Sequence, residues 1–121
     1  MKAEIRRADP SRESLTHEHC VILELANDPG DPDVSIARAR VLPGETTEWH
    51  RVNGIDERYV IVRGTGKVEV GDLPPAVVCE GDVVRIPANT PQRITNVGDE
   101  DLVFFCVCSP RFMLSAYVTG R

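Results

Sequence analysis

The chain is built from short runs of β-branched and other apolar residues, each ended by a cluster of turn-forming residues. This pattern limits the folds open to it more than any other feature. The clusters contain Gly, Pro, Asn and Asp, as in NDPGDPD, VNGID and NVGDED. Helical periodicity is nearly absent. Many short strands at close spacing are typical of a β-sandwich or a β-barrel, so an all-β fold is predicted.

The apolar runs give the approximate positions of the strands. One helical turn is predicted after Pro10, over Ser11–His17. The runs predicted to be strands are Val21–Ala26, Val34–Leu42, Thr46–Arg51, Glu57–Arg63, Lys67–Val70, Ala76–Cys79, Asp82–Ile86, Gln92–Thr95 and Leu102–Cys108.

The length of 121 residues suits one domain with a single core. Residues 1–121 are therefore predicted to form one domain, with a barrel over about 20–110, an N-terminal arm over 1–19 and a tail over 111–121. The tail carries several apolar residues, and it is expected to pack on the barrel or on a partner subunit.

Charge and hydropathy indicate which partners to expect. The net charge is −5 and no Lys/Arg run occurs, which argues against nucleic acid as a partner. No apolar run approaches the roughly 20 residues of a membrane helix, and the N-terminal residues do not resemble a signal peptide. We therefore expect a cytoplasmic protein with no membrane partner and with reduced cysteines at positions 20, 79, 106 and 108.

A histidine and a glutamate lie on two predicted strands that a Gly-containing turn connects. Alternation places His50 and Val52 on one face of the first strand, and Glu57 and Tyr59 on one face of the second. Gln92 can point into the same space from a later strand. A carboxylate inside an apolar barrel is costly unless a metal ion, an arginine or a proton neutralises it.

Several other side chains are candidates to face the same pocket. Arg38, Arg40 and Arg85 are possible partners for Glu57, whereas Arg93 alternates with Gln92 and should face away. Cys106 and Cys108 share a face and either line the pocket or pack as small apolar residues. The pair His17 and His19 is interpreted as surface histidines, because no third ligand is near them in sequence.

The first of two motifs in this chain resembles the first motif of the cupin family, G-x5-H-x-H-x3–4-E-x6-G. Gly44, His50, Glu57 and Gly64 match it in spacing and in residue type. Val52 stands where the family has its second histidine.

The second motif resembles the family pattern G-x5-P-x-G-x2-H-x3-N. Gly81, Pro87 and Asn96 match, while Asn89 replaces a glycine and Gln92 replaces the histidine. Asparagine tolerates the left-handed backbone that glycine would supply at this turn.

The resemblance implies a cupin jelly-roll β-barrel (a double-stranded β-helix), often dimeric, with a pocket at one mouth. The metal ligands of the family would fall on His50, Val52, Glu57 and Gln92, of which Val52 cannot coordinate. The predicted site is therefore a divalent ion (Fe, Mn, Ni, Cu or Zn) held by His50, Glu57 and the carbonyl oxygen of Gln92. A homodimer is expected from the resemblance alone.

Two functions remain open from the sequence, and no catalytic residue is assigned. One is a metal-dependent enzyme of dioxygenase or isomerase type that acts on a small carbonyl or carboxylate compound. The other is a metal-free, non-catalytic barrel that binds a small ligand, as in a sensor. The side chains predicted to line the pocket in either case are Val52, Tyr59, Arg38, Arg40, Arg85, Cys106 and Cys108.

Overall fold

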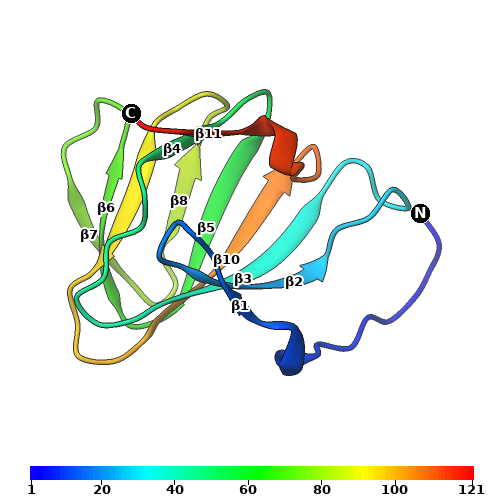
Figure 1. Ribbon diagram of the computed structural model, residues 1–121, viewed down its shortest axis with the longest axis horizontal. Coiled ribbons are helices and arrows are strands. Elements are labelled where there is room, and N and C mark those ends of the chain that lie inside the picture. Colours follow the sequence, from blue (N-terminus) through cyan, green and yellow to red (C-terminus); the bar gives the residue numbers. More distant parts are fainter.

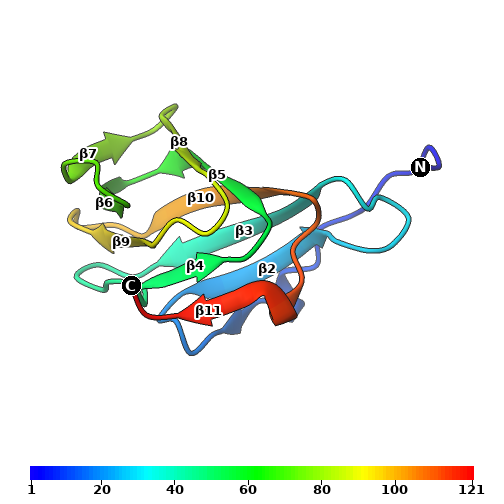
Figure 2. The same ribbon diagram turned by 90° about the horizontal axis from the view of Figure 1, so that it is seen from above.

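The computed structural model describes residues 1–121 and contains two antiparallel β-sheets that face each other (Figure 1). The two layers are seen from above in Figure 2. The first sheet has the order β1 (Ser14–Leu15), β2 (Val21–Ala26), β3 (Ser35–Val41), β10 (Leu102–Ser109), β5 (Asp56–Arg63) and β8 (Val83–Ile86). The second has the order β11 (Tyr117–Thr119), β4 (His50–Val52), β9 (Gln92–Asn96), β6 (Thr65–Val70) and β7 (Ala76–Cys79).

All nine predicted strands are present, with two local differences. The third predicted strand, which is β4, begins later than predicted, because Thr46 makes only an isolated bridge to Thr95 and the strand begins at His50. The predicted helical turn is wrong beyond Arg12: a 3-10 turn η1 covers Pro10–Arg12, and Ser14–Leu15 pairs with β2 instead. The other helical element, η2 (Leu114–Ala116), is equally short, so no helix is long enough to span a membrane.

The core follows from alternation along the strands, which points every second side chain between the sheets. On β5, Glu57, Tyr59 and Ile61 are buried. The apolar residues packed between the sheets include Ala39, Val41, Ile61, Val68, Val70, Ile86, Ile94, Leu102 and Phe104.

The turns use left-handed residues where the two motifs place them. Gly64 has φ +87°, and a Cβ there would lie 2.8 Å from the carbonyl oxygen of Asp101. Asn89 has φ +65°, which confirms that asparagine takes the left-handed position of the missing glycine.

The C-terminal tail folds back onto the barrel of its own chain. Strand β11 pairs with β4 (Figure 2). The Phe112 N–H donates to Ser35 Oγ at 2.8 Å, and the Gly120 N–H donates to the Trp49 carbonyl at 2.8 Å. The tail therefore supplies side chains to one end of the barrel, as described below.

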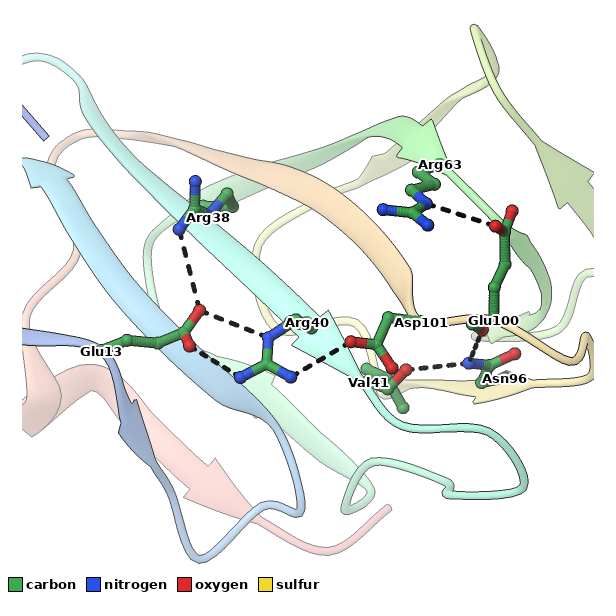
Figure 3. Close-up of polar contacts among 8 residues, drawn as sticks. All are labelled: Glu13, Arg38, Arg40, Val41, Arg63, Asn96, Glu100 and Asp101. Carbon is green, nitrogen blue, oxygen red and sulfur yellow. Dashed lines mark hydrogen bonds and ion pairs between the residues drawn. The ribbon is translucent and has the colours of Figure 1, made fainter. Parts of the chain in front are cut away.

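An ion-pair network on the outer face of the first sheet attaches the N-terminal arm (Figure 3). Glu13 Oε1 accepts from Arg40 Nη2 at 2.7 Å, and Glu13 Oε2 lies 3.8 Å from Arg38 Nη2. Arg40 also reaches Asp101 at 3.1 Å. These arginines alternate with Ala37 and Ala39 and so face outward.

Asn96, the last residue of the second motif, connects three chain segments (Figure 3). It is 1% exposed, and its Nδ2 donates to the carbonyl oxygens of Val41 and Glu100 at 2.8 Å each. Asn96→Ala would leave both carbonyls without these partners, so we expect the free energy of unfolding to fall by about 2–3 kcal/mol in urea denaturation. The exposed Asn53→Ala is the control, and equal effects of the two variants would contradict this role.

Candidate functional site

A half-open cavity of about 370 Å³ lies between the two sheets. Its walls are the inward-facing side chains of β2, β3, β5 and β10 on one side and of β4 on the other. Two terminal segments complete it, residues 16–20 before β2 and residues 112–117 of the tail. Twelve of its twenty lining residues are hydrophobic, so the few polar groups determine its chemistry.

His50 is held in one orientation at the wall of this cavity. It is 5% exposed, its Nδ1 lies 2.9 Å from the Glu48 carbonyl oxygen, and its ring stacks on Tyr117 with centroids 4.8 Å apart. A carbonyl oxygen only accepts, so Nδ1 carries the hydrogen and Nε2 is the acceptor in neutral His50. The Glu18 carboxylate is 3.9 Å from Nδ1.

Glu57 is a buried carboxyl group with one satisfied oxygen. It is 8% exposed, and Oε2 accepts from Cys108 Sγ at 3.8 Å, whereas Oε1 has no hydrogen-bond partner. Burial raises the pKa of Glu57, and nearby His50 and the Gln92 amide only partly oppose this. Most buried polar atoms have a hydrogen-bond partner, so the unpartnered Oε1 of Glu57 requires an explanation.

The three predicted arginines do not supply that partner, which corrects the sequence-based placement. Arg38 and Arg40 lie on the outer face of β3 and pair with Glu13 (Figure 3). Arg85 is exposed on the edge strand β8, where it is opposite Arg58. None of them lines the cavity, so the alternative in which an arginine neutralises Glu57 is wrong.

Gln92 is placed close to His50 but is already engaged. The two residues are register partners across β4 and β9, and Gln92 is 1% exposed. The Tyr59 hydroxyl donates to Gln92 Oε1. Tyr59 lines the cavity, whereas Gln92 is not among its lining residues.

Cysteine thiols form part of the wall. Cys106 and Cys108 both line the cavity, and Cys20, which was not predicted to line it, joins them. Burial raises the pKa of all three thiols. They therefore remain protonated and act as small, weakly polar wall groups.

The terminal segments contribute lining residues that the motifs do not include. Glu18 and Glu24 come from the segment around β2, and Phe112 and Tyr117 come from the tail. The apolar residues of the tail indicated packing but not the place of contact. His17 and His19 are both exposed, and His17 Nε2 lies 3.8 Å from Glu48 Oε2.

Comparison with known proteins agrees with this architecture. The cupin domain family Cupin_2 matches residues 37–108. The chain belongs to the cupin family. An uncharacterized protein of Methanocaldococcus jannaschii is 33% identical over 78 residues, which span 64% of this chain and 62% of that relative.

Solved cupin-like structures share the fold at low identity. KdgF from Halomonas sp. aligns with TM-score 0.79 and 16% identity over 92% of this chain and 96% of its own. A Klebsiella pneumoniae protein with a double-stranded β-helix domain gives TM-score 0.79 and 13% identity, over 98% and 99% of the two chains. A predicted oxalate decarboxylase from Thermotoga maritima gives 0.75 and 20%, over 88% and 99%.

The metal-ligand positions of the cupin family are only half filled by donors in this chain. Val52 lines the cavity with an apolar side chain, and the Gln92 carbonyl oxygen accepts from Tyr59. No three His, Cys, Asp or Glu side chains converge. His50 and Glu57 alone are fewer than the three or four protein donors of a typical resident metal centre, so a third donor would have to come from Gln92.

Proposed function

We propose that this cupin binds a small organic molecule in the cavity, with the polar end of the ligand at His50 and Glu57, and that it needs no resident metal ion. The observation that carries the proposal is Glu57 Oε1, a buried acceptor without a partner that belongs to a cavity-lining side chain. A ligand that donates a hydrogen bond would supply the missing partner. An apolar cavity with few placed polar groups is the usual form of a small-molecule site.

The polar groups also favour one class of ligand. Glu57 and the His50 Nε2 both accept hydrogen bonds, so the bound group must donate. A carboxylate compound, which the sequence left open, would meet Glu18, Glu24 and Glu57 with no arginine or lysine in the cavity. The same argument weighs against a dianion such as oxalate, and the likeness to a predicted oxalate decarboxylase supports the fold alone.

A metal-dependent enzyme is the second candidate. The observation that favours it is that an acceptor nitrogen and a free carboxylate oxygen line one cavity. His50 and Glu57 would hold the ion, and Gln92 would add its carbonyl after releasing Tyr59. Such an ion would polarise a carbonyl group as a Lewis acid, while the chain itself binds the ligand, orients it with Tyr117 and keeps water away.

Benzyl alcohol is a suitable first probe, because its ring fits the apolar walls and its hydroxyl donates. In an amide NMR titration we expect the shifts to cluster at Val52, Tyr59 and Phe104, and to disappear in Ala37→Phe, which fills the cavity from a half-exposed position. Thr95→Phe, on the outer face of β9, is the matched control. Shifts scattered over the surface, or unchanged by Ala37→Phe, would contradict the proposed site.

A further inference from the structure

Apart from the histidines His17 and His50, the ionisable side chains that carry a charge at neutral pH around the cavity are all acidic. Glu18, Glu24 and Glu57 line it, and no lysine or arginine does. On the outer faces of the sheets several acidic groups are paired, as Glu13 is with Arg40 and Glu69 is with Arg93. Unlike those surface groups, the cavity carboxylates have no cation of the chain within reach of an ion pair, apart from the approach of Glu18 to His50.

The innermost of these groups is arranged to accept from a ligand. Glu57 is 8% exposed, and its Oε1 has no partner. His50 does not satisfy it, because the carboxylate within ion-pair distance of His50 is that of Glu18. With Nδ1–H turned to the Glu48 carbonyl, the free Nε2 is a second acceptor at the same wall. Both side chains line the cavity, and a cationic donor placed between them would satisfy both acceptors.

The burial of the carboxylates and the aromatic walls of the cavity both favour a cationic ligand. Loss of hydration raises the pKa of Glu57 more than nearby His50 and Gln92 lower it, and it also raises the pKa of Glu24 against the hydrogen bond from Asn27. Tyr59, Phe104, Phe112 and Tyr117 line the same space. The faces of aromatic rings attract cations, and most strongly where water is excluded.

We propose that the ligand of this cavity is a protonated amine whose N–H groups donate to Glu57 Oε1 and His50 Nε2 and whose apolar part lies against the aromatic wall. The inference rests on the proposed function, because it assigns a chemical class to the ligand of that site. Charge-assisted hydrogen bonds to a buried carboxylate are stronger than neutral ones.

Three probes of one shape test the sign of the charge: benzylamine, benzyl alcohol and benzoate, titrated at pH 7 into chelator-treated protein and followed by amide NMR. We expect benzylamine to bind about tenfold or more tightly than benzyl alcohol, and benzoate to bind most weakly. Glu57→Gln should remove the preference for the amine over the alcohol. Glu69→Gln, which alters a surface carboxylate outside the cavity, should leave it unchanged.

The outcomes separate this inference from the proposed function. If benzyl alcohol binds in the cavity as tightly as benzylamine, or benzoate binds best, the amine assignment is wrong and the ligand site stands. If Zn²⁺ alone binds at Glu57 and no amine preference exists, the cation of this site is a metal and the assignment is again wrong. If none of the three probes shifts the cavity amides, the proposed function fails together with the inference.

Discussion

Replacing Val52 with histidine is expected to convert the two-donor wall into a metal centre. Val52 is 2% exposed, lines the cavity and lies on the same face of β4 as His50. Val52→His therefore adds an imidazole beside two existing donors. Outer-shell partners alone change metal affinity by about 10–100-fold, so a third direct ligand should raise it by at least that much.

The measurement is calorimetric titration of Zn²⁺ and Mn²⁺ into wild type and variant. Arg51→His is the matched control, because it adds a histidine to the same strand on the opposite face and should leave the affinity unchanged. Weak binding in wild type with a large gain in Val52→His would confirm that the donor set is one ligand short. Tight, stoichiometric binding already present in wild type would instead favour the metal-dependent enzyme.

The sequence predicted the barrel well because the fold depends on local signals. Alternating apolar residues and left-handed turn positions are visible in the chain itself, and Gly64 and Asn89 have the positive φ values that their motif positions require. Alternation also placed His50, Val52, Glu57 and Tyr59 correctly on the inner faces. These inferences need only neighbours along one strand.

The sequence could not show which face of a single strand points into the barrel, or where the terminal segments pack. Arg38 and Arg40 share a face, but the sequence does not say which face of β3 is inward, and the structure turns them to Glu13. Tyr117 stacks on His50 although the two are far apart in sequence, because β11 returns to pair with β4. Such contacts depend on tertiary structure that no motif records.

Glu57→Gln should make the ligand-free protein more stable while it removes the preference for a cation. The buried Oε1 has no partner, and an unsatisfied buried acceptor costs about 1–3 kcal/mol, more when it is charged. Glutamine keeps the shape and removes the charge. We therefore expect the free energy of unfolding at pH 8 to rise by about 1–3 kcal/mol in urea denaturation. Glu69→Gln should have the opposite sign, because Glu69 accepts from Arg93 Nε at 2.9 Å and loses that ion pair.

The raised pKa of Glu57 determines how the stability difference between Glu57→Gln and wild type changes with pH. Burial raises the pKa of Glu57 in the folded state above the ordinary value of about 4.3, so the folded protein holds the Glu57 proton more tightly than the unfolded chain does. Its contribution to stability is fully present below that ordinary value and is lost as pH rises through the folded-state pKa.

In Glu57→Gln no group titrates at this position, so the variant lacks this pH-dependent contribution to the free energy of unfolding. Its stability advantage should therefore be small at pH 4, grow as the pH rises and become constant once wild-type Glu57 is ionised. Saturating benzylamine should reduce the advantage at pH 8, because the ammonium group stabilises only the wild-type carboxylate. An advantage that is independent of pH, or a variant less stable than wild type at pH 8, would mean that a group of the chain already neutralises Glu57. The charged cavity would then need no cation from a ligand.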